Sequence, residues 1–104
     1  MTITTTRISS AARRASILAL ALPLAERYGF DSIPRETLLK QANIPASRFV
    51  QLWPIARFRA DLMREAVAKR NLRVLAQGLA ARHPVAMAAP REMRLAAAEA
   101  MVGS

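Results

Sequence analysis

Residues 38–53 read Leu-Leu-Lys-Gln-Ala-Asn-Ile-Pro-Ala-Ser-Arg-Phe-Val-Gln-Leu-Trp, and they indicate the architecture more strongly than any other stretch. Apolar residues recur at helical spacing on both sides of Asn43-Ile44-Pro45. Asparagine tolerates the left-handed conformation of a helix end, and the small Ala42 lets two helices approach closely. Pro34 suits the first turn of the earlier helix. Two short helices joined by so short a turn form a helix-turn-helix, which this segment therefore predicts.

The outer face of the second helix of this pair, predicted from Pro45 to Trp53, is polar. Phe49 and Ile44 are expected to hold this helix against its neighbour. The opposite face then presents Ala46, Ser47, Arg48 and Gln51. Arginine, glutamine and serine side chains bind base edges and phosphate groups, so this face is a candidate nucleic-acid interface.

The residues before this pair predict one long helix. Ser9 or Ser10 can cap its start, and its apolar stripe continues to about Tyr28. Pro23 lies inside the helix and is expected to bend it, because proline removes one backbone hydrogen bond. Gly29 is a natural place for the helix to end.

The residues after the pair predict two further helices. Pro54 ends the 45–53 helix, and a longer fourth helix is expected from about Ile55 to Gln77. Gly78 and His83-Pro84 indicate a break, and a last amphipathic helix is predicted from Arg91 to Val102.

The aromatic residues locate the predicted core. All five lie between residues 28 and 58 and are expected to cluster where the first four helices meet: Tyr28, Phe30, Phe49, Trp53 and Phe58. The chain after residue 78 is then expected to be peripheral. We divide the chain into a flexible basic arm (1–9), a helix-turn-helix domain (10–56) and a helical extension (57–104) that could serve dimerisation.

The composition of the 104-residue chain fits one small helical domain. Alanine and leucine dominate, and β-branched residues are few, which favours an all-α fold. The absence of cysteine excludes disulfides, thiolate zinc ligands and a cysteine nucleophile. Sixteen basic residues against seven acidic ones give a formal charge of +9. This excess points to a polyanionic partner: DNA, RNA or an anionic membrane surface.

Residues 13–62 resemble the N-terminal DNA-binding domain of the TetR family of transcriptional repressors, over roughly half of the chain. The similarity rests on five stretches: Arg13-Arg14-Ala15-Ser16-Ile17-Leu18, Ala25-Glu26-Arg27-Tyr28-Gly29-Phe30, Ala42-Asn43-Ile44-Pro45, Ser47-Arg48-Phe49 and Leu52-Trp53-Pro54. The family has Ile-Leu and Gly-Phe around its first helix, Ala-Gly-Val-Ser at the turn, and a recognition helix ending in Tyr-x-His-Phe. The resemblance implies a TetR-like three-helix helix-turn-helix domain, here extended by the longer fourth helix and a short C-terminal helix.

Some positions depart from the family pattern. Asn43 stands in place of the turn glycine. Ile33-Pro34 replace threonines that bind phosphate, and Arg35 stands where an apolar residue is usual. Val50 and Leu52 replace the tyrosine and histidine that contact DNA.

The function expected from these features is sequence-specific DNA binding by a small transcription regulator, with helix 45–53 in the major groove. Arg48 and Gln51 are expected to meet base edges, and Ser47 a base or a phosphate. The backbone of double-stranded DNA is expected to be held by four arginines: Arg13, Arg14, Arg35 and Arg57. A homodimer would read two half-sites about one helical turn apart. Too few residues follow Pro54 to enclose a ligand pocket, so no small-molecule inducer is expected.

Two other functions remain open. One is an adaptor on the same fold that acts through protein contacts. Phages and mobile elements use such proteins as terminase small subunits, replication accessories or inhibitors of a host protein. Val50, Leu52 and Pro34 favour this alternative, because they replace residues that contact DNA in the family. The other is a membrane-surface peptide, suggested by the apolar first helix, although we expect no membrane binding.

Nothing in the chain predicts an enzyme, a cofactor or a metal site. Glycine-rich phosphate loops and serine elbows are absent, and His83 stands alone as an expected loop residue. Four acidic residues that are close to basic ones in the sequence fit surface pairs better than acid–base catalysis: Glu26, Glu36, Asp61 and Glu65. The apolar run 17–24 is shorter than the roughly 20 residues of a membrane span and lacks a cleavage site. We therefore expect a cytoplasmic protein with a buried first helix.

Overall fold

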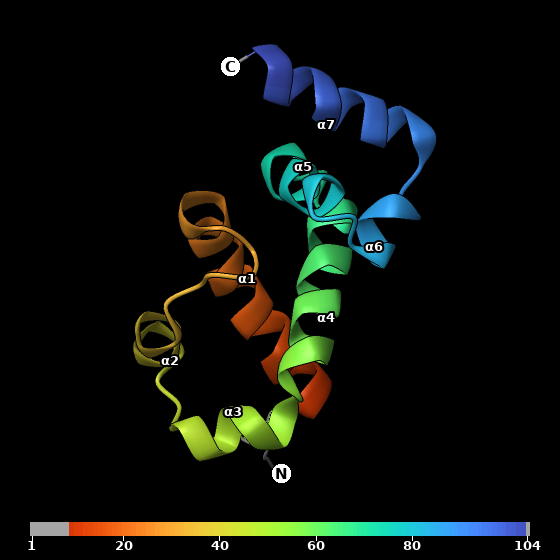
Figure 1. Ribbon diagram of the computed structural model, residues 1–104. Coiled ribbons are helices and arrows are strands. Elements are labelled where there is room, and N and C mark those ends of the chain that lie inside the picture. The colour runs from red at the N-terminus through yellow and green to blue at the C-terminus, as the bar shows by residue number, and fades with distance from the viewer. Residues whose placement is uncertain (1–8, 104) are drawn as a thin grey trace, which may run out of the picture.

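The computed structural model describes residues 9–103, and every regular element within them is a helix. The helices are α1 (Ser10–Tyr28), α2 (Arg35–Ala42), α3 (Ala46–Leu52), α4 (Ile55–Ala68), α5 (Leu72–Ala80), α6 (Pro84–Met87) and α7 (Arg91–Gly103) (Figure 1). The expected all-α fold is confirmed. The predicted arm, apart from Ser9, lies outside the described residues.

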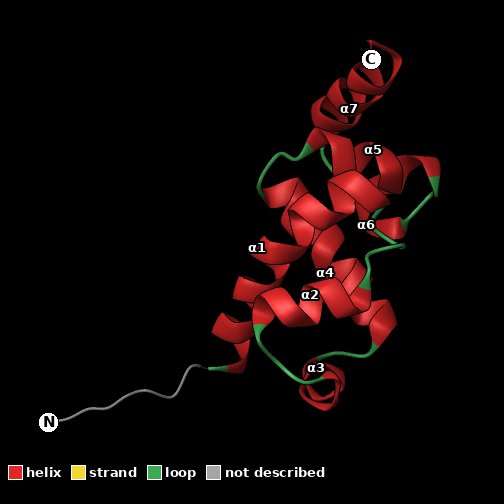
Figure 2. Cartoon of the chain, turned by 90° about the vertical axis from the view of Figure 1, so that its left-hand side faces the viewer, coloured by secondary structure: helices red, strands yellow, loops and turns green. Residues whose placement is uncertain are grey.

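The molecule is elongated, with α3 and α7 at opposite ends (Figures 1 and 2). It measures 52 × 29 × 21 Å and has a radius of gyration of 15.1 Å, against about 13 Å for a compact domain of 100 residues. Helices α1 and α4 pack together and connect the ends. We call α2, α3 and the first turns of α1 and α4 the α3 end, and residues 69–103 the α7 end.

Local hydrogen bonds and backbone preferences determine where helix α1 begins and ends. The Ser9 hydroxyl accepts the N–H of Ala12 at 3.1 Å, which caps the first turn. Gly29 ends the helix with φ of +102°, where a side chain would be strained, and its N–H donates to the Ala25 carbonyl at 2.8 Å. Both predicted ends are confirmed, and Pro23 lies inside the helix as expected.

The connection between α2 and α3 has the predicted length. Asn43 adopts the left-handed conformation, with φ of 56°, immediately after α2. The N–H of Ile44 donates to the Leu39 carbonyl at 3.2 Å, and the Ile44 side chain is buried. Pro45 then precedes α3 in an extended conformation. Both helices end within two residues of the positions predicted from the sequence.

An aromatic cluster holds α3 against α4. The ring centroids of Phe49, Trp53 and Phe58 lie 5.1–5.5 Å apart in tilted and edge-on arrangements. Trp53 is 1% exposed, and its indole N–H donates to an Asp61 carboxylate oxygen at 2.8 Å. The core placement predicted for Trp53 and Phe58 is confirmed. Tyr28 is a correction, since it is 45% exposed and contacts the Arg27 guanidinium instead of the cluster.

The expected continuous helix from 55 to 77 is wrong, because the chain breaks into α4 and α5. Arg70 adopts a positive φ of 54°, and the Asn71 side chain accepts the N–H of Val74 at 3.1 Å to cap α5. The other end of the Asn71 amide donates to Glu26 on α1 at 2.8 Å. Asparagine before an apolar periodic segment is a helix-start signal, so the residues contained this information.

Gly78 does not break a helix, contrary to expectation, but lies inside α5. A Cβ at this position would meet Met63 Cε at 2.5 Å and the Cβ of Ala86 at 2.8 Å. The missing side chain thus allows α6 and α4 to pack directly on α5. The break comes later, at Arg82 with φ of 56° and His83-Pro84.

The chain after residue 78 belongs to the core, which corrects the expectation that it is peripheral. Helix α7 packs on α5, and four buried apolar residues from α6, α7 and their connection join the main cluster: Ala86, Ala89, Met93 and Ala97. The apolar residues of α7 divide between two faces. Met93 and Ala97 are buried, whereas Leu95 and Met101 are about half exposed.

Candidate nucleic-acid interface

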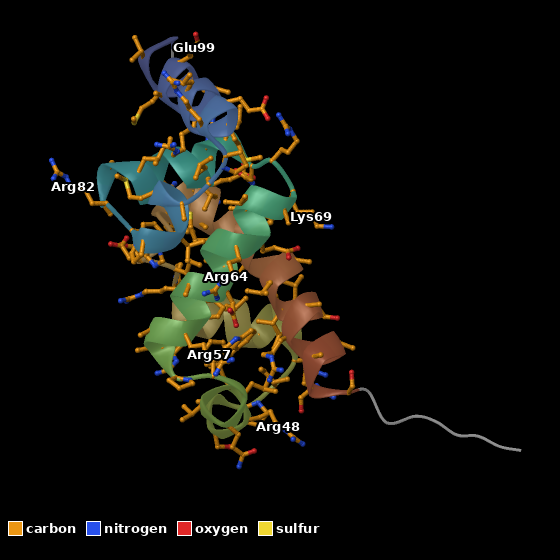
Figure 3. All side chains as sticks on the ribbon, turned by 90° about the vertical axis from the view of Figure 1, so that its right-hand side faces the viewer. Arg48, Arg57, Arg64, Lys69, Arg82 and Glu99 are labelled. Atoms are coloured by element: carbon orange, nitrogen blue, oxygen red, sulfur yellow. The ribbon has the colours of Figure 1, made fainter. Side chains whose placement is uncertain are left out.

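Helix α3 presents its polar side chains to solvent at the tip of the molecule. Ser47, Arg48 and Gln51 are all exposed, and Figure 3 shows Arg48 directed away from the body of the protein. Ser47 and Gln51 are four residues apart and share one helix face, with Arg48 beside them. An α-helix with its side chains is about 10–12 Å across, which fits the width of the major groove of B-DNA.

The opposite face of α3 explains this orientation. Phe49 and Trp53 are four residues apart and almost fully buried, and Leu52 between them is half-buried. Because these rings pack on Phe58 of α4, rotating α3 would expose the aromatic cluster to water. The polar face is therefore held outward by the core.

The arginines expected to contact the DNA backbone also lie at the α3 end. Arg35 is the first residue of α2, and Arg57 lies in the first turn of α4; both side chains are exposed. Figure 3 shows Arg57 just above Arg48 at the same end. Arg13 and Arg14 lie near the start of α1 and are half-buried. The seven predicted site residues thus occupy one end of the molecule.

The starts of α2 and α4 add backbone donors to this end. Pro34 and Pro54 occupy the N-cap positions, and within residues 9–103 neither helix start receives a side-chain cap. Amides at the first turn of a helix favour an anion, because they point outward and the helix dipole is positive there. Each of these starts therefore pairs backbone donors with an arginine, Arg35 or Arg57.

Few carboxylates oppose these cations at the α3 end. Asp61 is already engaged, since it accepts hydrogen bonds from the Trp53 indole and from Arg64, the latter at 2.7 Å. Glu36 lies in the first turn of α2 and Asp31 precedes the helix, and both are exposed. Positive charge therefore predominates here, although basic residues such as Arg64, Lys69 and Arg82 also line the rest of the molecule (Figure 3).

The sequence did not reveal a groove beside α3. It has a volume of about 410 Å³, and it is lined by residues from the α1–α2 connection, α2, α3 and α4. Val50 and Ile55 form part of its wall and are 58% and 52% exposed. The groove is assembled from four separate segments, so no local pattern predicts it. The one hint in the sequence is that the β-branched residues Val50 and Ile55 lie close to the aromatic residues of the core.

His83 does not form part of the interface. Its Nδ1 accepts the N–H of Val85 at 3.2 Å, which caps α6, and its ring meets Phe30 edge-on at 5.6 Å. Burial, and secondarily the charge of Arg64, lowers the pKa of His83 below its usual value. Across residues 9–103, His, Asp and Glu form no cluster suited to a metal ion. Nor does any helix in that range have the length and apolarity to cross a membrane.

Comparisons with known proteins leave the function to be argued from these residues. No protein-family model matches the chain, and neither curated proteins nor solved structures give a match.

Proposed function

We propose that this protein is a TetR-like helix-turn-helix protein that binds double-stranded DNA and regulates transcription, with α3 in the major groove. The observation that carries this proposal is the arrangement of α3. Its aromatic side holds it in the core, while Ser47, Arg48 and Gln51 extend into solvent. Arg48 suits a guanine edge, Gln51 an adenine edge, and Ser47 a base or phosphate.

The DNA backbone would be held by both arginines and helix starts. Arg35 and Arg57 stand beside the uncapped first turns of α2 and α4, and Arg13 and Arg14 lie at the start of α1. If these contacts neutralise roughly six phosphates, the logarithm of the binding constant should fall with that of the salt concentration at a slope near −5. A response that is flat with salt would contradict phosphate binding.

Selection from a random pool of DNA duplexes tests the proposal directly. The wild-type protein should enrich one motif, and Arg48→Ala should weaken binding to that motif by about 1–3 kcal/mol and relax preference at one base pair. Arg73→Ala is the matched control, because Arg73 is also exposed but lies on α5 at the α7 end. An Arg48→Ala protein that keeps the wild-type motif would remove Arg48 from base reading.

Homodimerisation is part of this proposal, with α7 as the pairing element. Leu95, Ala98 and Val102 recur at helical spacing and form an exposed apolar face, with Val102 87% exposed. This face lies at the end opposite α3, so pairing there leaves both α3 helices free for DNA. If two copies pair through α7, the Leu95→Glu protein should sediment as a monomer. It should also lose binding to DNA duplexes that carry two half-sites.

A protein-binding adaptor is the second candidate, and the groove beside α3 favours it. Val50 and Ile55 place exposed apolar surface next to the polar face, at an end where a pure DNA reader needs polar contacts. Purification without nuclease distinguishes the candidates. A DNA-binding protein retains nucleic acid and shows a raised 260/280 nm absorbance ratio, whereas an adaptor carries a stoichiometric protein.

A further inference from the structure

The groove beside α3 has an aromatic floor. Trp53, Phe49 and Phe58 contribute the buried cluster beneath it, and Val50 and Ile55 stand as exposed walls. Its volume of about 410 Å³ falls within the range of small-molecule sites, which are mostly apolar with a few polar groups that fix orientation. An apolar group placed here would cover surface that now faces water.

The rim of the groove is polar and unbalanced in charge. Arg35 and Arg59 both line it, and the Arg35 guanidinium lies 5.5 Å from the centre of the Phe49 ring. One N–H of Arg59 donates to the Asp31 carbonyl at 3.4 Å, which holds this guanidinium at the rim. Asp31 is the acidic residue of the lining, so the groove has two basic residues and one acidic residue.

We propose that this groove is a binding site for a small amphipathic anion, a carboxylate with an alkyl or aryl body. The body would lie between the exposed Val50 and Ile55 walls, above the buried rings of Trp53 and Phe58, and the carboxylate would meet Arg35 and Arg59. The charge of the rim requires an anionic head, and the apolar floor requires a body that a free phosphate lacks. This site shares Arg35 with the proposed DNA interface, so carboxylate and DNA phosphate would compete for that guanidinium, but decanoate binding can be measured without DNA.

Titration of the isotope-labelled full chain with decanoate tests the site. Trp53 is the only tryptophan, so a single indole N–H resonance reports on the aromatic cluster beneath the groove. Decanoate should shift that resonance saturably. Decanol, which has the same body without the charge, should bind about fivefold more weakly, in line with the roughly 1 kcal/mol upper value for exposed charge pairs. Decyltrimethylammonium should not bind.

Substitutions at the rim should change decanoate affinity in opposite directions. Arg59→Gln should weaken binding by about two- to fivefold, and Asp31→Asn should strengthen it by about the same factor. Asparagine keeps the oxygen that accepts the Ser32 hydroxyl, so the local turn is preserved. A merely apolar groove would show neither effect.

Ile55→Glu provides the test of location. This residue is about half exposed, so the variant should fold, yet a carboxylate in the wall should weaken decanoate binding about tenfold. Met87→Glu is the matched control, because Met87 on α6 is similarly exposed and lies outside the groove, and this variant should bind normally.

Three outcomes would overturn the site. Equal affinity for decanoate and decanol would remove the role of the rim arginines. Unchanged binding by Ile55→Glu would place decanoate elsewhere. An indole resonance that responds to a DNA duplex or to a partner protein, but to none of the amphiphiles, would make the groove part of a macromolecular interface.

Discussion

The two ends of the molecule differ in how most of their helices begin. At the α7 end, α5 and α6 begin with side chains that cap them, Asn71 and His83. At the α3 end, α2, α3 and α4 all begin after a proline, which offers no acceptor. The first turns of α5 and α6 thus receive side-chain caps, whereas those of α2, α3 and α4 leave their backbone donors to solvent or a ligand. Helix α1, capped by Ser9, and helix α7, which follows Pro90, depart from this division.

The two ends of the molecule also differ in how their helices pack. The α7 end relies on small residues and close backbone approach, as at Gly78 and Ala86, and amide side chains tie it to α1. The α3 end relies on three large rings under one short helix. Helix α3 therefore depends on few packing interactions and keeps a large face exposed, as binding to a partner requires.

Removing the largest ring should have the strongest effect on stability. Trp53→Ala should destabilise the fold by about 3–5 kcal/mol, because it deletes a fully buried indole from the cluster. Urea denaturation followed by circular dichroism measures this change. Trp53→Phe is the control: it keeps a ring but loses the bond to Asp61, and it should cost distinctly less. A loss below about 1 kcal/mol in Trp53→Ala would show that α3 is not held by its rings.

The second largest loss of stability is expected where α5 and α6 approach closely, at Gly78. Gly78→Ala should destabilise by about 1–3 kcal/mol, since the new methyl group would overlap Ala86, although alanine is the better helix former. Thermal denaturation of Gly78→Ala, Ala86→Gly and the double variant gives the coupling between these sites. If residues 78 and 86 are in direct contact, adding Ala86→Gly to the Gly78→Ala protein should restore part of the lost stability. A stabilised Gly78→Ala would contradict the packing.

Cutting the link between α5 and α1 should have a smaller effect. The Gln77 amide donates to the Ala25 carbonyl and accepts the Phe30 N–H, both at 2.9 Å. Gln77→Ala should therefore lose about 1–2 kcal/mol, and amide hydrogen exchange should increase at Phe30. Gln41→Ala, on the exposed face of α2, should stay within about 0.5 kcal/mol of the wild type. Equal stability of the two variants would mean that Gln77 does not stabilise the packing of α5 on α1.

The smallest expected effect is the pH dependence from His83. Its pKa is lowered by burial and then by Arg64, so the unfolded chain binds this proton more readily. The stability from this group is present above its usual value of 6.5 and is lost as the pH falls from there through the folded pKa. His83→Asn keeps a cap for α6 without titrating. Urea midpoints at pH 8 and 5 should differ less in this variant, and an identical difference would exclude His83.

The α2–α3 region was predictable because its signals act locally. Asn43 adopts the left-handed conformation, and Pro45 and Pro54 delimit α3 through their own backbone restrictions. The spacing of Phe49 and Trp53 then indicated which face of α3 is buried, and so predicted that Arg48 and Gln51 are exposed. None of these inferences requires a distant residue.

The errors lay where distant residues decide the outcome. At the break after Arg70, the local cap by Asn71 is reinforced by its bond to Glu26 on α1, and Gly78 is explained only by the proximity of Met63 and Ala86. Tyr28 is aromatic, yet it is largely exposed because the rings around Phe49 cluster at the other end of α1. Composition and spacing do not contain these contacts.

The amino-acid sequence alone determined the helical class, the ends of α1, the α2–α3 turn and the outward face of α3. Each of these depends on backbone preferences or on burial within one or two turns of helix. The tertiary structure alone decided that α7 joins the core and that a groove with two arginines opens beside α3. These features arise where segments far apart in the chain meet, and such contacts depend on the relative placement of whole helices.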